Sequence, residues 1–203
     1  MNGKQNSGFT IIELIVTIGI VVMILGAIWI FILRGYQFQE LELNQIANQE
    51  QARAGIEEIS SELREAAQSD NGAYPIESAD SYSIIFYSDI DDDGSREKIH
   101  YWLDGQFFKK TVTEPTAFPV SYPAENESEE KIITRDVING TTPIYEYFDR
   151  NYQGTEEPMS LPVNISNIRL IKITLIVDNN TDKEPPPFTL SSDIQLRNLK
   201  DNL

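Results

Sequence analysis

The stretch that decides the fold is FTIIELIVTIGIVVMILGAIWIFIL, which runs from Phe9 to Leu33. As a helix that rises about 1.5 Å per residue, a stretch of this length reaches roughly 37 Å, enough to cross a bilayer core of about 30 Å. A secretory signal peptide has a shorter apolar run and a small-residue cleavage site after it, and this stretch has neither. The stretch therefore predicts a helix that spans a membrane once.

The charges beside this stretch predict its orientation. The residues before it carry Lys4 and the free amino terminus, whereas the residues after Arg34 soon turn acidic. Positive charge collects in the cytoplasmic flank of a membrane helix. We therefore expect the N-terminus on the inner side of the cytoplasmic membrane and residues 35–203 outside it, although Arg34 at the far end weakens the difference.

Glu13 is the one ionisable side chain in the stretch. A carboxylate inside an apolar span costs on the order of a few kcal/mol and usually marks a partner. Glu13 lies close to the start of the run, so its side chain can reach toward the interface and lower that cost. The residues alone leave open a plain membrane anchor and a helix whose carboxylate has a partner.

The residues GFTIIELIV, from Gly8 to Val16, resemble the processing signature of type IV pilin and pseudopilin precursors. In that family a short leader ends in Gly, a prepilin peptidase cuts after it and methylates the new N-terminal residue, and the fifth mature residue is Glu. The resemblance implies a leader of residues 1–8, with cleavage after Gly8 and methylation of Phe9. It also implies that Glu13 acts in assembly, paired with the terminal amine of an adjacent subunit. The implied partners are the peptidase, an inner-membrane assembly platform and other pilin-like subunits, and no cofactor is required.

Residues 34–69 continue the helix in a different pattern. Small and apolar residues recur every three or four positions at Ala52, Ile56, Ile59, Leu63 and Ala66. This spacing puts one apolar stripe on a helix whose other faces carry glutamates. Asn71-Gly72 supplies a stop signal. We therefore expect one helix from Thr10 to Ser69, with a membrane and assembly part (9–33) and an amphipathic part (34–69) packed on a sheet.

The remainder, residues 70–203, is expected to form an antiparallel, β-rich head. Short runs of β-branched and aromatic residues predict strands at 83–87, 99–103, 106–112, 144–148, 168–177 and 189–197. Asp104-Gly105 between two of these runs predicts a hairpin, because both residues tolerate positive φ. Residues 113–130 hold three prolines and five glutamates and are typical of a solvated excursion. A long helix followed by strands is the α+β order of a pilin-like fold.

Three strings in this head carry a second resemblance: FYSDIDDDGSREKIHYWLDG from Phe86, PIYEYFD from Pro143 and SSDIQLRN from Ser191. They are similar to J-type minor pseudopilins of type II secretion and to W-type minor pilins. The resemblance implies a structural subunit that is assembled near the tip of a type IV pilus or a type II secretion pseudopilus. Its head would then lie in a periplasmic or extracellular filament.

One loop of the head has the spacing of a metal site. Positions 1, 3, 5, 6 and 9 of an EF-hand-like loop are filled by Asp89, Asp91, Asp93, Gly94 and Glu97. Oxygen ligands around a sharp glycine turn suit a hard cation such as Ca²⁺. Position 12 is His100 rather than a bidentate Glu, which predicts weak binding, roughly 0.1–1 mM. The alternative is a polar hairpin turn without an ion, because Asp and Gly favour turns by themselves.

Composition argues against several other functions. The net charge of −16 opposes nucleic-acid binding, which depends on neutralised phosphates. The absence of cysteine and the single histidine exclude thiolate and His-pair metal sites and leave little room for a Ser-His-Asp triad. No carboxylate pair at a fixed separation is identifiable, so we expect no enzyme. Two functions remain: an assembled structural subunit, and a membrane-anchored or filament-displayed adhesin whose head holds Ca²⁺.

Overall fold

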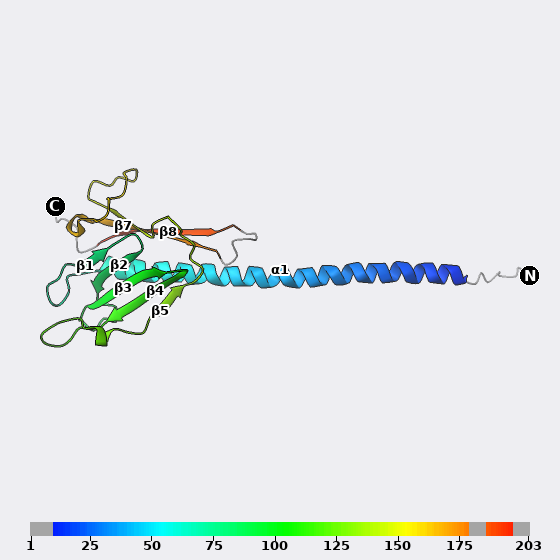
Figure 1. Ribbon diagram of the computed structural model, residues 1–203, viewed down its shortest axis with the longest axis horizontal. Helices are drawn as coiled ribbons and strands as arrows, with labels where there is room; N and C mark the ends of the chain where they lie inside the picture. Colours follow the sequence, from blue (N-terminus) through cyan, green and yellow to red (C-terminus); the bar gives the residue numbers. More distant parts are fainter. Residues whose placement is uncertain (1–9, 179–185, 197–203) are drawn as a thin grey trace, which may run out of the picture. The chain divides into compact units, whose positions relative to one another are not determined.

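The computed structural model describes residues 10–178 and 186–196, without the side chains of residues 36–48 (Figure 1). The chain divides into two compact units, Met1–Asn44 and Gln45–Leu203. Helix α1, Ile11–Glu65, has residues in both units, and each unit is described by itself. The expected leader, residues 1–8, lies outside the described residues, and the boundary expected at residue 33 stays a prediction.

In the first unit, α1 contains a long, mostly apolar segment. Its segment Ile11–Gly35 has a mean hydropathy of 2.9 and is long and apolar enough to cross a membrane. The large apolar side chains of this segment are exposed, from 42% at Ile32 to 80% at Ile11. Contiguous apolar surface of this extent needs lipid or another protein to cover it. The segment agrees with the helix predicted from Phe9 to Leu33.

The helix ends at Glu65, before the end expected at Ser69. The reason lies in the backbone hydrogen bonds that follow it. The N–H of Ala67 donates to the carbonyl of Tyr87, in strand β2 (Ser83–Ser88), at 2.9 Å. The chain therefore leaves helical pairing for a strand partner, which no local stop signal indicates.

The last turns of α1 pack their apolar stripe into the core of the second unit, as predicted. The stripe is buried at every position, with exposures of 7% or less at Ala52, Ile56, Ile59, Leu63 and Ala66. Next to the stripe, Cγ2 of Ile133 occupies the place that a β-carbon on Gly55 would need. Glycine therefore lets α1 approach strand β5 (Lys131–Thr134) closely at this point.

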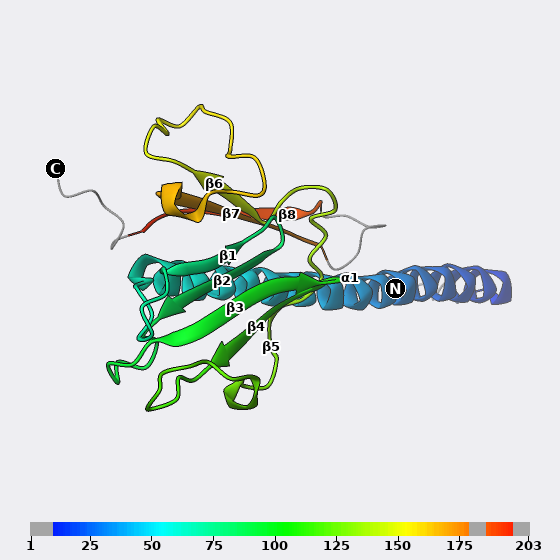
Figure 2. The same ribbon diagram turned by 60° about the vertical axis from the view of Figure 1, so that its left-hand side comes forward.

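The larger sheet has five antiparallel strands in the order β1-β2-β3-β4-β5 (Figure 2). With β2 and β5 they are β1 (Ile76–Ala79), β3 (Glu97–Asp104) and β4 (Phe107–Thr113). Strands β3 and β4 form the predicted hairpin, with Asp104 paired opposite Phe107 and Gly105 at a φ of 60°. The two turn residues are Gly105 and Gln106, one position later than the sequence predicts.

The smaller sheet has three antiparallel strands in the order β6-β7-β8. They are β6 (Tyr145–Phe148), β7 (Leu170–Val177) and β8 (Phe188–Gln195). The sequence pattern predicts one sheet, whereas the described residues of the head form two. The N–H groups of Ile144 and Tyr145 both donate to the carbonyl of Ser81, at 2.9 and 3.0 Å. Ser81 lies in the loop between β1 and β2. These two hydrogen bonds therefore connect the sheets at one point, and no described strand of the larger sheet pairs along its length with β6.

All six predicted strands are present, and their described ends lie within two residues of the prediction. The end predicted at Arg197 falls outside the described residues. The sequence pattern does not predict β1 and β5, which have four residues each. The predicted excursion includes the short 3-10 helix η1 (Ala124–Asn126), and a second one, η2 (Ile165–Asn167), precedes β7. The α+β arrangement expected from the pilin resemblance is confirmed.

Candidate functional site

The first candidate site is the start of α1. Gly8 and Phe9 lie outside the described residues, which begin at Thr10. The N–H of Thr10 donates to Glu13 Oε2 at 3.3 Å, and the N–H of Glu13 donates to Thr10 Oγ1 at 3.4 Å. This is a capping box, in which each side chain satisfies a backbone donor of the first turn. Helix α1 therefore begins at Ile11, within the stretch that carries the processing signature, and Glu13 lies in its first turn.

This cap gives Glu13 a partner inside its own chain. The hydroxyl of Thr10 also donates to Glu13 Oε2, at 3.3 Å. All three hydrogen bonds are longer than the usual 2.7–3.2 Å or so, and are therefore weak. The partial positive charge of the helix N-terminus favours a carboxylate at this position. Glu13 is thus held at the first turn of α1 by weak hydrogen bonds within its own chain.

The second candidate site is the acidic turn between β2 and β3, residues 89–96. Three backbone N–H groups each donate to a carboxylate oxygen: Gly94 to Asp89 Oδ2 (3.1 Å), Asp93 to Asp91 Oδ1 (3.1 Å) and Ile90 to Glu97 Oε2 (2.9 Å). Asp92 and Gly94 adopt positive φ, at 61° and 91°, so the chain turns sharply here. The turn is therefore built around its own carboxylates.

Three of the four predicted metal ligands converge in this turn. One carboxylate oxygen from each of Asp89, Asp91 and Glu97 lies within 4.8 Å of the other two. Asp93 is outside this group, and its Oδ1 accepts the N–H of Ser95 at 2.7 Å. Clustered carboxylate oxygens are the ligands that hard cations take in proteins. The arrangement can therefore hold such an ion with three of the predicted residues.

Glu97 is the unusual member of the group, because it is fully buried, with an exposure of 0%. Burial raises the pKa of Glu97 to about 7, against the lowering effect of the Ile90 N–H, and the nearby carboxylates of Glu114 and Asp91 raise it further. Among the described residues, Glu97 Oε1 finds no hydrogen-bond partner, and neither does the buried Oδ1 of Asp89. The turn therefore contains two buried carboxylate oxygens, Glu97 Oε1 and Asp89 Oδ1, that accept no hydrogen bond from any residue the structure describes.

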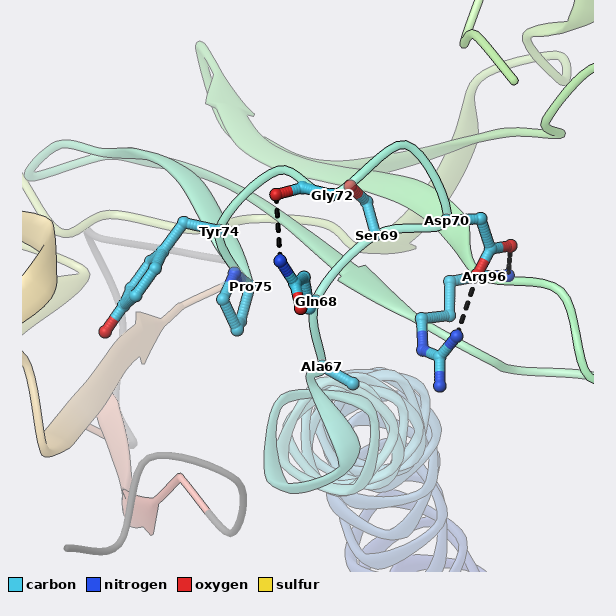
Figure 3. Close-up of a pocket in the computed structure, with 8 residues that line it drawn as sticks. All are labelled: Ala67, Gln68, Ser69, Asp70, Gly72, Tyr74, Pro75 and Arg96. Carbon is cyan, nitrogen blue, oxygen red and sulfur yellow. Dashed lines mark hydrogen bonds and ion pairs between the residues drawn. The ribbon is translucent and has the colours of Figure 1, made fainter. Parts of the chain in front are cut away.

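The acidic turn is fastened to the segment that follows α1. The backbone N–H and the guanidinium of Arg96 both donate to the carboxylate of Asp70, at 2.8 and 2.7 Å, and Tyr122 donates its hydroxyl to the Arg96 carbonyl at 2.8 Å. Figure 3 shows Asp70 and Arg96 at one side of an open depression that is also lined by Ala67, Gln68, Ser69, Gly72, Tyr74 and Pro75. The two charged side chains of this depression, Asp70 and Arg96, form an ion pair with each other. This ion pair connects the acidic turn to the segment that follows α1.

A buried ionic cluster, which the sequence pattern does not predict, joins α1 to β4. Lys110 Nζ lies 2.9 Å from Glu58 Oε1 and also contacts Glu62, which accepts the hydroxyl of Tyr101 at 2.9 Å. Burial raises the pKa of Glu62, with Lys110 opposing it. At Glu58, hydrogen bonds from Lys110 and Lys131 outweigh burial and lower the pKa. The one sequence signal is that Glu58 and Glu62 share a helix face four residues apart.

Comparison with known proteins identifies the N-terminal segment. A family model described as the prokaryotic N-terminal methylation motif matches residues 3–29, which include Gly8, Phe9 and Glu13. No curated protein matches the chain. The motif continues into the apolar segment Ile11–Gly35. Together the motif and the apolar helix are consistent with a type IV pilin or pseudopilin precursor, a membrane-anchored, single-pass protein that serves as a structural subunit rather than an enzyme.

Proposed function

We propose that the chain is a minor pilin or pseudopilin, assembled near the tip of a type IV pilus or a type II secretion pseudopilus. The observation that carries this proposal is the methylation motif at residues 3–29, which runs directly into the apolar segment Ile11–Gly35. A prepilin peptidase cleaves after Gly8 and methylates Phe9. The similarity of three head strings to J-type minor pseudopilins and W-type minor pilins supports a minor subunit.

The apolar segment serves two environments in turn. Lys4 before the apolar segment favours an N-terminus in the cytoplasm and a head outside the cytoplasmic membrane. Before assembly, lipid covers the apolar side chains that are exposed between Ile11 and Leu33. An inner-membrane assembly platform then moves the subunit into the filament. There, helices of other subunits cover the same apolar side chains by close packing.

Glu13 fixes the register of assembly by pairing with the Phe9 amine of a neighbouring subunit. A carboxylate among apolar helices is strongly unfavourable alone and much less so when it is paired. The long hydrogen bonds to Thr10 keep this carboxylate at the first turn of the helix. A charged amine displaces them, because hydrogen bonds between charged groups are shorter and stronger.

Processing is tested by coexpressing the full chain with and without a prepilin peptidase, followed by intact mass and N-terminal sequencing. With the peptidase we expect a product that begins at methylated Phe9, and without it a chain that begins at Met1. Gly8→Val should block cleavage, whereas Gly3→Val, the same change within the leader, should leave it intact. A chain that still begins at Met1, beside a peptidase that cuts a control substrate, would contradict the proposal and indicate a plain anchored domain.

The second candidate is a membrane-anchored or filament-displayed, calcium-dependent adhesin. The converging carboxylates of Asp89, Asp91 and Glu97 favour it, because they would give the head its own cation. The variant Glu13→Val separates the two functions. It should abolish assembly of a pilin subunit and leave unchanged any binding by the head alone.

A further inference from the structure

The turn between β2 and β3 concentrates negative charge around one buried side chain. Oxygens of Asp89, Asp91 and Glu97 lie within 4.8 Å of one another, and Glu97 is completely buried. Glu97 is paired in register with Ser88 at the end of β2. Within the described parts of the chain, the buried hydroxyl of Ser88 and Glu97 Oε1 both go without a hydrogen-bond partner. Buried polar groups in proteins nearly always have a hydrogen-bond partner, so the lack of one at these atoms indicates that another group binds here.

Among the residues that the structure describes, neither basic neighbour of Glu97 in the sequence supplies the missing positive charge. The basic residues on either side of Glu97 in the sequence pair with other carboxylates. Nη1 of Arg96 lies 2.7 Å from Oδ1 of Asp70, and Nζ of Lys98 lies 2.7 Å from Oε1 of Glu77. The nearby carboxylates of Glu114 and Asp91 raise the pKa of Glu97 further, because each carries the same negative charge. A buried carboxylate surrounded by like charge is strongly unfavourable unless a cation compensates it.

The backbone holds the carboxylates in position for such a cation. The N–H of Ile90 occupies Glu97 Oε2, and the N–H of Gly94 occupies Asp89 Oδ2. The second oxygen of each group, Glu97 Oε1 and Asp89 Oδ1, is the one left without a donor in the described structure. Ligands fixed before binding lose less conformational entropy when the ion arrives.

We propose that this turn binds one Ca²⁺ ion through Asp89, Asp91 and Glu97. Calcium takes six to eight oxygen ligands or so in irregular geometry and accepts bidentate carboxylates, with water or carbonyl groups completing the shell. Magnesium demands near-ideal octahedral geometry and keeps several waters, which suits a half-buried carboxylate cluster poorly. The ligand set is smaller than the sequence predicts, because Asp93 stays outside. The site belongs to the head and stands whether or not the chain assembles into a filament.

The ion connects the end of β2 to the start of β3, and its binding is expected to be weak. His100 stands where an EF-hand loop has a bidentate Glu, and its Nε2 lies 3.0 Å from the hydroxyl of Ser83. Three carboxylates without that ligand predict a Kd of about 0.1–1 mM, the range of extracellular calcium modules. Calcium that binds only the folded chain raises its unfolding temperature, and the rise grows with calcium concentration.

The test uses the full chain in detergent micelles, freed of metal with a chelator and then titrated with CaCl₂ by calorimetry. Thermal unfolding is followed by circular dichroism in parallel. The parent should show saturable binding and a higher unfolding temperature at about 10 mM calcium. Glu97→Gln should weaken binding at least about tenfold and remove the shift. Its unfolding temperature without calcium should equal or exceed that of the parent, because a buried charge is gone.

Asp92→Asn is the matched control, since it makes the same charge change in the same turn. Asp92 is exposed and outside the converging group, and Asn tolerates its φ of 61°. It should bind calcium like the parent, whereas Asp89→Asn, a second ligand variant, should lose binding as Glu97→Gln does. The proposal fails if the parent shows no saturable heat up to about 10 mM calcium. It fails equally if Asp92→Asn weakens binding as much as Glu97→Gln, or if MgCl₂ gives the same response as CaCl₂.

Discussion

Cγ2 of Ile133 stands where a β-carbon on Gly55 would have to lie, so α1 and β5 meet with no helix side chain between them. The neighbouring stripe residues Ala52 and Ile56 are buried in the same core. Protein interiors are packed about as densely as organic crystals, so an added atom at such a contact displaces its surroundings. The contact at Gly55 therefore sets how closely the helix approaches the sheet.

Gly55→Ala is expected to destabilise the head by about 1–3 kcal/mol, the usual effect of overpacking a core. At an open helix position the same change stabilises by up to about 1 kcal/mol. Gly35→Ala, where an added β-carbon meets nothing within 4 Å, is the control. Thermal unfolding of the full chain in detergent measures both. Gly55→Ala should lower the stability of the Ile133→Ala variant by less than it lowers the stability of the parent. An equal loss in both would show that the strain lies elsewhere.

Lys110→Met is expected to lower the stability of the head by about 3 kcal/mol, because it leaves Glu62 and Glu58 near one another with less positive charge. The side chain of Lys110 is only 6% exposed and that of Glu62 12%. Lys109→Met is the control on the same strand, since the carboxylates that pair with Lys109 are more than half exposed. Its effect should be much smaller, because exposed ion pairs are screened by water. Equal losses from the two variants, in chemical unfolding, would refute the buried cluster.

Thr10→Val separates helix capping from assembly. It removes the hydroxyl that accepts the Glu13 N–H and keeps the carboxylate. If Glu13 acts by pairing with an amine, Thr10→Val should still assemble, whereas Glu13→Val should not. The measurement is the fraction of subunit recovered in sheared filaments, with the head checked for folding by circular dichroism. Loss of assembly in both variants would instead make the cap the essential feature.

His100 is expected to make the stability of the head fall in acid. Burial lowers the pKa of His100 below its ordinary value of 6.5, with Glu127 and Glu77 opposing and Lys98 assisting. Below about pH 6.5 the unfolded chain binds a proton on this ring more readily than the folded chain, so the free energy of unfolding decreases. Between about pH 7.5 and pH 5.5 the parent should lose more stability than His100→Gln, measured by urea unfolding. Identical slopes would show that His100 does not contribute.

Local pattern predicts the helix and most strands here, because those segments bury regularly spaced side chains. Leu170–Val177 alternates between buried and half-buried residues along its whole length, as its sequence indicates. Ile76–Ala79 and Lys131–Thr134 are too short and too polar to show such a pattern, and their pairing with β2 and β4 defines them. The end of α1 likewise depends on a contact between Ala67 and Tyr87, which are distant in sequence.

The candidate sites divide in the same way. The spacing in the sequence is enough to predict Asp89, Asp91 and Glu97 as metal ligands, and their carboxylate oxygens do converge. Spacing also predicts Asp93, whose carboxylate turns to a backbone N–H two residues later, a local choice that an Asp in a turn often makes. The complete burial of Glu97 arises from the packing of the head around the start of β3, so no pattern of nearby residues shows it.

Gly55 also bears on how the head withstands a pull along its helix. The stripe of α1 repeats every three or four residues, so a slide of one turn, about 5.4 Å, would restore many of its apolar contacts. The same slide would bring Gln51 or Ile59 opposite Ile133, and either residue carries a β-carbon where none fits. Force directed along the last turns of α1 is therefore opposed at this contact, in addition to the ion pairs that join Glu58 and Glu62 to Lys110.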